Sequence, residues 1–169
     1  MSTKNEIVIQ DACILIDLVD LDLIDDFHRL DIIVFTTKVV IEEITNEEQF
    51  KKISGFIEKG ILRIDTEGDD EVTLTMFDEI TGLSLADCSV LEFAIRKQCT
   101  VLSADKRLRN ECNRRKMEVR GLLWVVEELY VKGIITNERA VEKLKAYPEL
   151  NKRAPTSEIE KLISRLLGA

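Results

Sequence analysis

The sequence lacks most of the motifs on which hydrolases and nucleotide-binding proteins depend. It contains one histidine, His28, and no G-x-S-x-G, P-loop or G-x-G-x-x-G motif. A serine hydrolase triad or a nucleotide-binding loop therefore has no support. His28 stands in an acid-rich segment and is expected to be a surface residue. No apolar run approaches the roughly 20 residues that a membrane-spanning helix needs, so no membrane association is expected.

The four cysteines form neither a C-x-x-C pair nor a cysteine–histidine cluster. The N-terminal segment also lacks the basic start and the small-residue cleavage site of a secretory signal. We therefore expect a cytoplasmic protein with reduced thiols. A nucleophilic cysteine would need a histidine partner, and none is evident. The cysteines are Cys13, Cys88, Cys99 and Cys112.

The formal net charge of −8 is unevenly distributed along the chain. Residues 1–104 carry 22 acidic and nine basic residues, whereas residues 105–169 carry ten acidic and 15 basic residues. Within 106–120 there are seven basic residues and two acidic ones. This segment could follow a phosphate backbone beside an acidic centre. The alternative is a solvated helix face without a partner.

Short apolar runs alternate with amphipathic segments, which predicts an α/β protein. Strands are expected at residues 7–9, 32–35, 61–64, 99–102 and 117–119. Continuous β-branched runs such as 32–35 are typical of parallel strands that are buried on both faces. We therefore predict a three-layer α/β/α sandwich with a mostly parallel central sheet. Thr36 or Thr37 is expected to cap the helix after the second strand, and Gly60 to end the helix that follows.

The chain is organised around residues 83–109, which predict a helix, a buried strand and the start of another helix. Ser84 is expected to cap the first helix, with Asp87 as the capping carboxylate three residues later. Asp105 follows the strand, at the end where open α/β sheets place their ligand sites. Residues at helical spacing predict one apolar face: Leu85, Cys88, Leu91, Ala94 and Ile95.

Acidic residues recur at the junctions between the expected elements. Asp11 follows the first strand, Glu42 and Glu43 lie on the helix after the second, Asp87 opens the central helix and Asp105 follows the fourth strand. Each has a structural alternative, because Asp11 and Asp105 could be helix N-caps, Asp87 a capping-box residue, and the glutamates a solvated face.

Carboxylates that converge repel one another unless a cation neutralises them. Parallel strands place their carboxyl ends at one edge of the sheet, so Asp11 and Asp105 can converge there. Mg²⁺ and Mn²⁺ prefer carboxylate and water ligands. Two such ions can activate water and stabilise the leaving oxygen of a phosphodiester.

Four segments of the sequence resemble the PIN domain family of metal-dependent ribonucleases, which includes the toxins of VapBC-type toxin–antitoxin pairs. The matching segments are IVIQDACILIDL, TTKVVIEEI, LSLADCSVLEFAIRK and VLSADKRLRNEC. GLLWVVEELYVKGIIT also looks like the C-terminal helical part of that family, so the resemblance covers about residues 5–147. One departure is Cys13, which stands where such proteins often have a small polar residue.

The resemblance implies a centre of four acids that cleaves RNA with Mg²⁺ or Mn²⁺. Asp11, Asp87 and Asp105 would hold the metal, and Glu43 would be a further ligand or orient the attacking water. Glu43 is preferred to Glu42 because it directly precedes Ile44, as the family's glutamate commonly does. Ser103 would contact these ligands and hold them in place without binding the metal itself. The RNA would be contacted by Lys106, Arg107, Arg109, Arg114 and Arg115.

A second hypothesis is a PIN-fold protein that acts through protein contacts and has no nuclease activity. It could be a toxin silenced by an antitoxin protein, or a homodimer. Residues 1–147 are expected to form the nuclease-like domain, and residues 148–169 a linker between Pro148 and Pro155 followed by an amphipathic helix. The apolar stripe of that helix needs a cover, either a partner or the chain's own domain.

Overall fold

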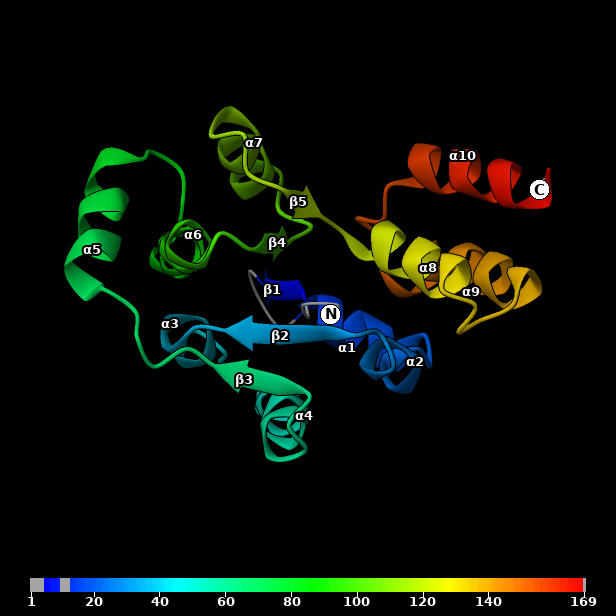
Figure 1. Ribbon diagram of the computed structural model, residues 1–169, viewed down its shortest axis with the longest axis horizontal. Coiled ribbons are helices and arrows are strands. Elements are labelled where there is room, and N and C mark those ends of the chain that lie inside the picture. The colour runs from blue at the N-terminus through cyan, green and yellow to red at the C-terminus, as the bar shows by residue number, and fades with distance from the viewer. Residues whose placement is uncertain (1–4, 10–12, 169) are drawn as a thin grey trace. The chain divides into compact units, whose positions relative to one another are not determined.

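The strands form a parallel sheet in the computed structural model, which describes residues 5–9 and 13–168 (Figure 1). The sheet has five strands in the order β3-β2-β1-β4-β5, and every described pair of neighbours is parallel. This confirms the predicted α/β class. The strands are β1 (Asn5–Ile9), β2 (Ile32–Thr36), β3 (Leu62–Ile64), β4 (Thr100–Leu102) and β5 (Val119–Arg120).

Helices connect the strands and continue after the last one. Thr37 caps α3 by accepting a hydrogen bond from the backbone of Val40, and Gly60 follows α4 with a positive φ of 73°. Both were expected from the sequence. The helices are α1 (Cys13–Asp20), α2 (Ile24–His28), α3 (Lys38–Glu42), α4 (Glu47–Glu58), α5 (Asp70–Glu79), α6 (Leu85–Lys97), α7 (Lys106–Arg114), α8 (Leu122–Val131), α9 (Asn137–Leu150) and α10 (Thr156–Leu167).

The chain divides into two compact units. The first comprises residues 1–14 and 31–120 and contains the sheet; the second comprises residues 15–30 and 121–169. Among the described residues, no helix is both long enough and apolar enough to cross a membrane. The predicted division into residues 1–147 and 148–169 stays a prediction.

The first unit packs around α6, which contacts β1, β4, α3 and α5. Every residue from Ala86 to Ala94 is buried. Phe93 of α6 packs against Phe35 of β2, with 5.1 Å between ring centroids. A helix that is covered on several sides also buries some polar residues, and α6 buries Asp87, Ser89 and Glu92.

The predicted apolar face of α6 is wrong at its C-terminal end. Ile95 was expected to point inward, yet it is 41% exposed, whereas Glu92 is 5% exposed. Arg96, four residues after Glu92, makes this possible: its Nε donates to Glu92 Oε1 over 2.8 Å. The buried carboxylate is thereby paired, which burial of a charge requires.

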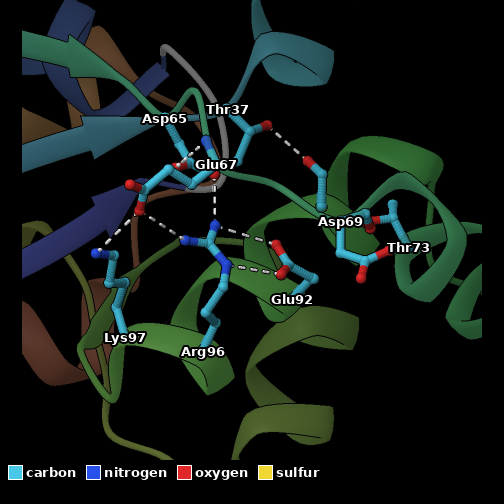
Figure 2. Close-up of polar contacts among 9 residues, drawn as sticks. Thr37, Asp65, Glu67, Asp69, Thr73, Glu92, Arg96 and Lys97 are labelled. Carbon is cyan, nitrogen blue, oxygen red and sulfur yellow. Dashed lines mark hydrogen bonds and ion pairs between the residues drawn. The ribbon is translucent and has the colours of Figure 1, made fainter.

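Arg96 also binds the loop that follows β3 (Figure 2). Its Nη2 donates to Asp65 Oδ2 over 2.6 Å, and the Asp65 side chain is 7% exposed. Its guanidinium carbon lies 5.3 Å from the ring centroid of Phe93. The hydrogen bonds that Arg96 donates to Glu92, together with the charges of Glu92 and Asp65, raise the pKa of Arg96 further above its ordinary value. One cation thus holds two buried acids from distant parts of the chain.

In the second unit, α8 packs on α9, and α10 packs on α9. The apolar stripe of α10 is covered, because Ile159, Leu162 and Leu166 are buried. Of the two covers considered for this stripe, the structure provides the chain's own helix. Pro148 was expected to start a linker but lies inside α9. Proline has no backbone N–H to donate within the helix. The last turn of α9 is held instead by the buried Tyr147 and by Asn151, whose side-chain amide donates to Asp17 Oδ2 over 3.0 Å.

We predict that Arg96→Leu lowers the free energy of unfolding by about 3 kcal/mol, because it leaves two buried carboxylates without their cation. Lys97→Leu is the matched control, since Lys97 pairs with Glu67, whose side chain is 70% exposed. An exposed pair of this kind contributes about 0–1 kcal/mol. Urea denaturation of both variants measures the difference, and equal losses would contradict a special role for Arg96.

Candidate active site at the carboxyl end of the sheet

The strand order reverses between β1 and β4. From β1 the chain proceeds to β2 and β3 on one side, and it then returns to β4 and β5 on the other. Ile9, the last residue of β1, pairs with Leu102, the last residue of β4. Ligands of open α/β sheets bind at such a reversal, beyond the carboxyl ends of the strands. The residues that directly follow β4 are therefore the first candidates for a site.

Ser103 and Asp105 follow β4 and start α7. Ser103 is fully buried, and its Oγ accepts a hydrogen bond from the Asp105 amide over 3.0 Å. Asp105 is the N-cap of α7, and its Oδ1 accepts from the Leu108 amide over 2.9 Å. Within the described residues, no hydrogen bond reaches its Oδ2. The predicted capping role of Asp105 is thus present, and it occupies one carboxylate oxygen.

Asp87 lies in the first turn of α6 and is 6% exposed. Ser84 and Asp87 form the predicted capping box. The Asp87 amide donates to Ser84 Oγ, and the Ser84 amide donates to Asp87 Oδ2, both over 3.0 Å. A further contact joins α7 to the turn before α6, where Arg107 Nη1 donates to the Gly82 carbonyl over 3.4 Å.

The remaining two predicted acids differ in what the structure describes. Glu43 is exposed and follows the last residue of α3, and Glu42 is also exposed. Asp11 lies outside the described residues. Within the described residues, no three His, Cys, Asp or Glu side chains gather closely enough to hold a metal ion.

The donor chemistry of Asp87 and Asp105 fits a hard cation, because both offer carboxylate oxygens and the Oδ2 of Asp105 is not used by its cap. A third carboxylate would have to come from Asp11, which follows Ile9 by two residues, or from Glu43. The residues present thus fit a divalent cation as part of a larger ligand set.

The five predicted RNA contacts are not equivalent. Arg109 Nη1 donates to the Ser103 carbonyl over 2.8 Å, which ties its charge to the candidate site. Arg114 and Arg115 both bind Glu111, with Arg115 Nε donating to Oε1 over 2.7 Å. Lys106 and Arg107 are exposed at the start of α7. The charges nearest to Asp105 are therefore the most available ones.

Two buried thiols lie near the acids but are poor nucleophiles. Burial and the charge of Asp87 raise the pKa of Cys88 to about 11. Burial and Glu111 raise the pKa of Cys112 to about 11 as well. Both stay protonated at neutral pH, whereas a nucleophilic cysteine acts as the thiolate. His28 is exposed, as expected.

The sequence predicted Thr37 only as one of two possible helix caps, and it did not single out the other polar residues that hold the neighbours of α6 in place. These include Ser89, whose hydroxyl oxygen lies 2.6 Å from that of Thr37, and the acids that bind Arg96. The Glu92–Arg96 spacing of four residues was visible as a helical ion pair. Nothing in the sequence assigned Asp65 or Thr37 to the same helix.

The sequence model of a family described as the PIN domain matches residues 7–167. The chain therefore belongs to the PIN domain family, as its resemblance predicted. PIN domains are generally nucleases and typically use divalent metals. No curated protein matches the chain.

The ion pairs of Glu111 within α7 should stabilise the folded protein less as the pH becomes acidic. Hydrogen bonds from Arg114, then from Arg115, lower the pKa of Glu111 to about 2. Because the folded pKa lies below the unfolded value of about 4.3, the stabilisation is complete above about pH 4.3 and is lost as the pH falls toward 2. As the pH is lowered from 5 to 2, the midpoint temperature of thermal unfolding should fall less steeply for Glu111→Gln than for the parent. Parallel curves would contradict this pairing.

Proposed function

We propose that this PIN domain is a metal-dependent endoribonuclease that hydrolyses phosphodiester bonds of RNA. The observation that supports it most is the strand reversal between β1 and β4, which Asp105 and the buried Ser103 follow directly. Asp11, Asp87 and Asp105 would bind Mg²⁺ or Mn²⁺. When bound, the cation would lower the pKa of a water molecule and polarise the phosphodiester.

The chain's own residues would orient the reactants. Asp105 would keep its Oδ1 on the α7 backbone and offer Oδ2 to the cation. Glu43, which is exposed, would be a ligand or would orient the attacking water by accepting a hydrogen bond from it. Glu42 has the same exposure, so it is the competing candidate for this role.

The start of α7 would receive the substrate backbone. Lys106 and Arg107 are exposed next to Asp105, and the N-terminus of a helix favours anions. Their positive charge would offset the acidic first part of the chain, which otherwise repels RNA. Which RNA is cleaved would depend on surfaces beyond this charge.

The alternative for the same fold is a module that acts through protein contacts, with an antitoxin partner or a second copy of the chain. The C-terminal helix α10 does not favour this alternative, because α9 already covers its apolar stripe. The nuclease proposal therefore takes precedence over a purely regulatory module.

We predict that Asp105→Asn and Asp87→Asn each reduce Mn²⁺-stimulated RNA cleavage by at least about 100-fold, a loss at or above the range for outer-shell partners of a metal. Asparagine caps a helix as well as aspartate does at position 105, and at position 87 its side-chain carbonyl oxygen can still accept from the Ser84 amide, so the fold should persist. Cleavage of a fluorescent RNA with and without EDTA measures the effect. Glu43→Gln and Glu42→Gln, assayed in the same way, identify which glutamate contributes.

Asp69→Asn is the matched control for these variants. Asp69 caps α5 as Asp105 caps α7, with its Oδ1 accepting from the Val72 amide over 3.1 Å. This variant should cleave at the parental rate. Full Mn²⁺-stimulated activity in Asp105→Asn would contradict the proposal, and so would an equal loss in Asp69→Asn.

RNA binding should depend more on Lys106 than on Arg114. Arg114 is engaged by Glu111, whereas Lys106 is exposed beside Asp105. In an Asp105→Asn background, which would prevent cleavage, Lys106→Gln should lower the slope of log affinity against log salt by about 0.7. Arg114→Gln should change this slope less. Fluorescence anisotropy over a salt series measures both, and a larger effect of Arg114→Gln would contradict the assignment.

A further inference from the structure

Two buried hydroxyls connect α3 to the first turn of α6. Thr37 Oγ1 lies 2.6 Å from Ser89 Oγ. Ser89 Oγ lies 2.7 Å from the Ala86 carbonyl, and the Val40 amide lies 3.2 Å from Thr37 Oγ1. Thr37 and Ser89 are only 5% and 6% exposed. We refer to these four groups as the hydroxyl relay.

The relay has a single direction. The amide of Val40 donates to Thr37, and the hydroxyl proton of Ser89 goes to the Ala86 carbonyl. Since each hydroxyl has one proton, Thr37 must donate to Ser89. Every donor in this series of hydrogen bonds has one acceptor. Because both hydroxyls are buried, water does not compete for these bonds. Removing one hydroxyl would leave another buried polar group without its partner, which is costly.

The relay ends in two segments that carry predicted site acids. Ala86 directly precedes Asp87, and Thr37 caps the short helix that Glu42 and Glu43 end. Because α3 has only five residues, its cap fixes the direction of the whole helix. The relay thus connects the segment that carries Glu43 to the turn that carries Asp87.

We infer that Thr37 and Ser89 are positioning residues, which hold the helix of Glu43 at a fixed place relative to Asp87 so that both acids can serve one centre. The inference rests on the proposed function. It adds residues that carry no charge and would not contact the metal or the RNA themselves.

The neighbouring threonine shows that burial alone does not produce such a relay. Thr36 is completely buried, and within the described residues its hydroxyl has no hydrogen-bond partner. Thr36 and Thr37 therefore have the same side chain and nearly the same burial, but only Thr37 connects two helices (Thr37 is drawn in Figure 2). Thr36 is therefore a matched control for Thr37, because it is an equally buried threonine that does not connect the two helices.

The central test is Mn²⁺ binding and RNA cleavage by Ser89→Ala. This variant removes the acceptor of Thr37 but leaves the cap bond from Val40 in place. We expect Mn²⁺ affinity, measured by calorimetry, to fall by about 10–100-fold, as for other outer-shell partners. We expect kcat to fall with it, while KM for RNA stays unchanged. Thr37→Val should behave similarly, and Thr37→Ser should restore parental values.

Two controls separate positioning from stability. Thr36→Val should retain parental Mn²⁺ affinity. Ile53→Val removes a methyl group from a fully buried residue of α4 and lowers stability without touching the relay, so its affinity should also be parental. A loss of Mn²⁺ affinity in Ile53→Val equal to that in Ser89→Ala would overturn the inference.

The failures of the two proposals are distinguishable. Parental affinity and kcat in Ser89→Ala would overturn the positioning role and leave the nuclease proposal intact. A parent protein that binds no Mn²⁺ would overturn both. Amide hydrogen exchange gives a check that does not depend on the metal. In Ser89→Ala, which lacks the relay, exchange in residues 40–44 should be at least about tenfold faster than in Thr36→Val. Unchanged exchange there would also overturn the inference.

Discussion

The burial of α6 is the constraint on which the first unit depends. A helix covered by β1, β4, α3 and α5 cannot leave its polar groups to water, so each one needs a partner in the protein. Asp87 finds its partner in Ser84 of the same turn, Ser89 in Thr37 of α3, and Glu92 in Arg96. Arg96 in turn holds the loop after β3. These partners fix both the rotation of α6 and the neighbours that surround it.

Strand pairing and helix capping determine what lies at the carboxyl edge of the sheet. The pairing of Ile9 with Leu102 aligns the ends of β1 and β4, so the residues after each strand share an edge. Ser103 and the cap of α7 then fix Asp105, while Arg107 joins α7 to the turn before α6. Helix packing and strand pairing thus bring segments far apart in sequence to one region.

Much of this arrangement was predictable from local patterns. Continuous apolar runs gave the parallel strands, and Ser84, Asp87 and Gly60 gave helix ends, because these signals act within a few residues. The exposed Ile95 and the helical Pro148 were mispredicted, since tertiary contacts decided both. Arg96 makes burial of Glu92 possible, and Asn151 with Tyr147 holds the last turn of α9. The Thr37–Ser89 contact spans 52 residues and has no local signal. Asp11 lies outside the described residues, so its place in the site rests on the sequence.

Capping and metal binding are compatible roles for the same carboxylates. The N-terminus of a helix stabilises a negative charge, and Asp87 and Asp105 both lie at such a terminus. The cap of Asp105 occupies Oδ1 and thereby fixes the rotamer of the side chain. A carboxylate that is already fixed loses less conformational entropy when its other oxygen binds a ligand. The capping role of these carboxylates would therefore prepare the proposed ligand role, and only substitutions that keep the cap while removing the charge can separate the two roles.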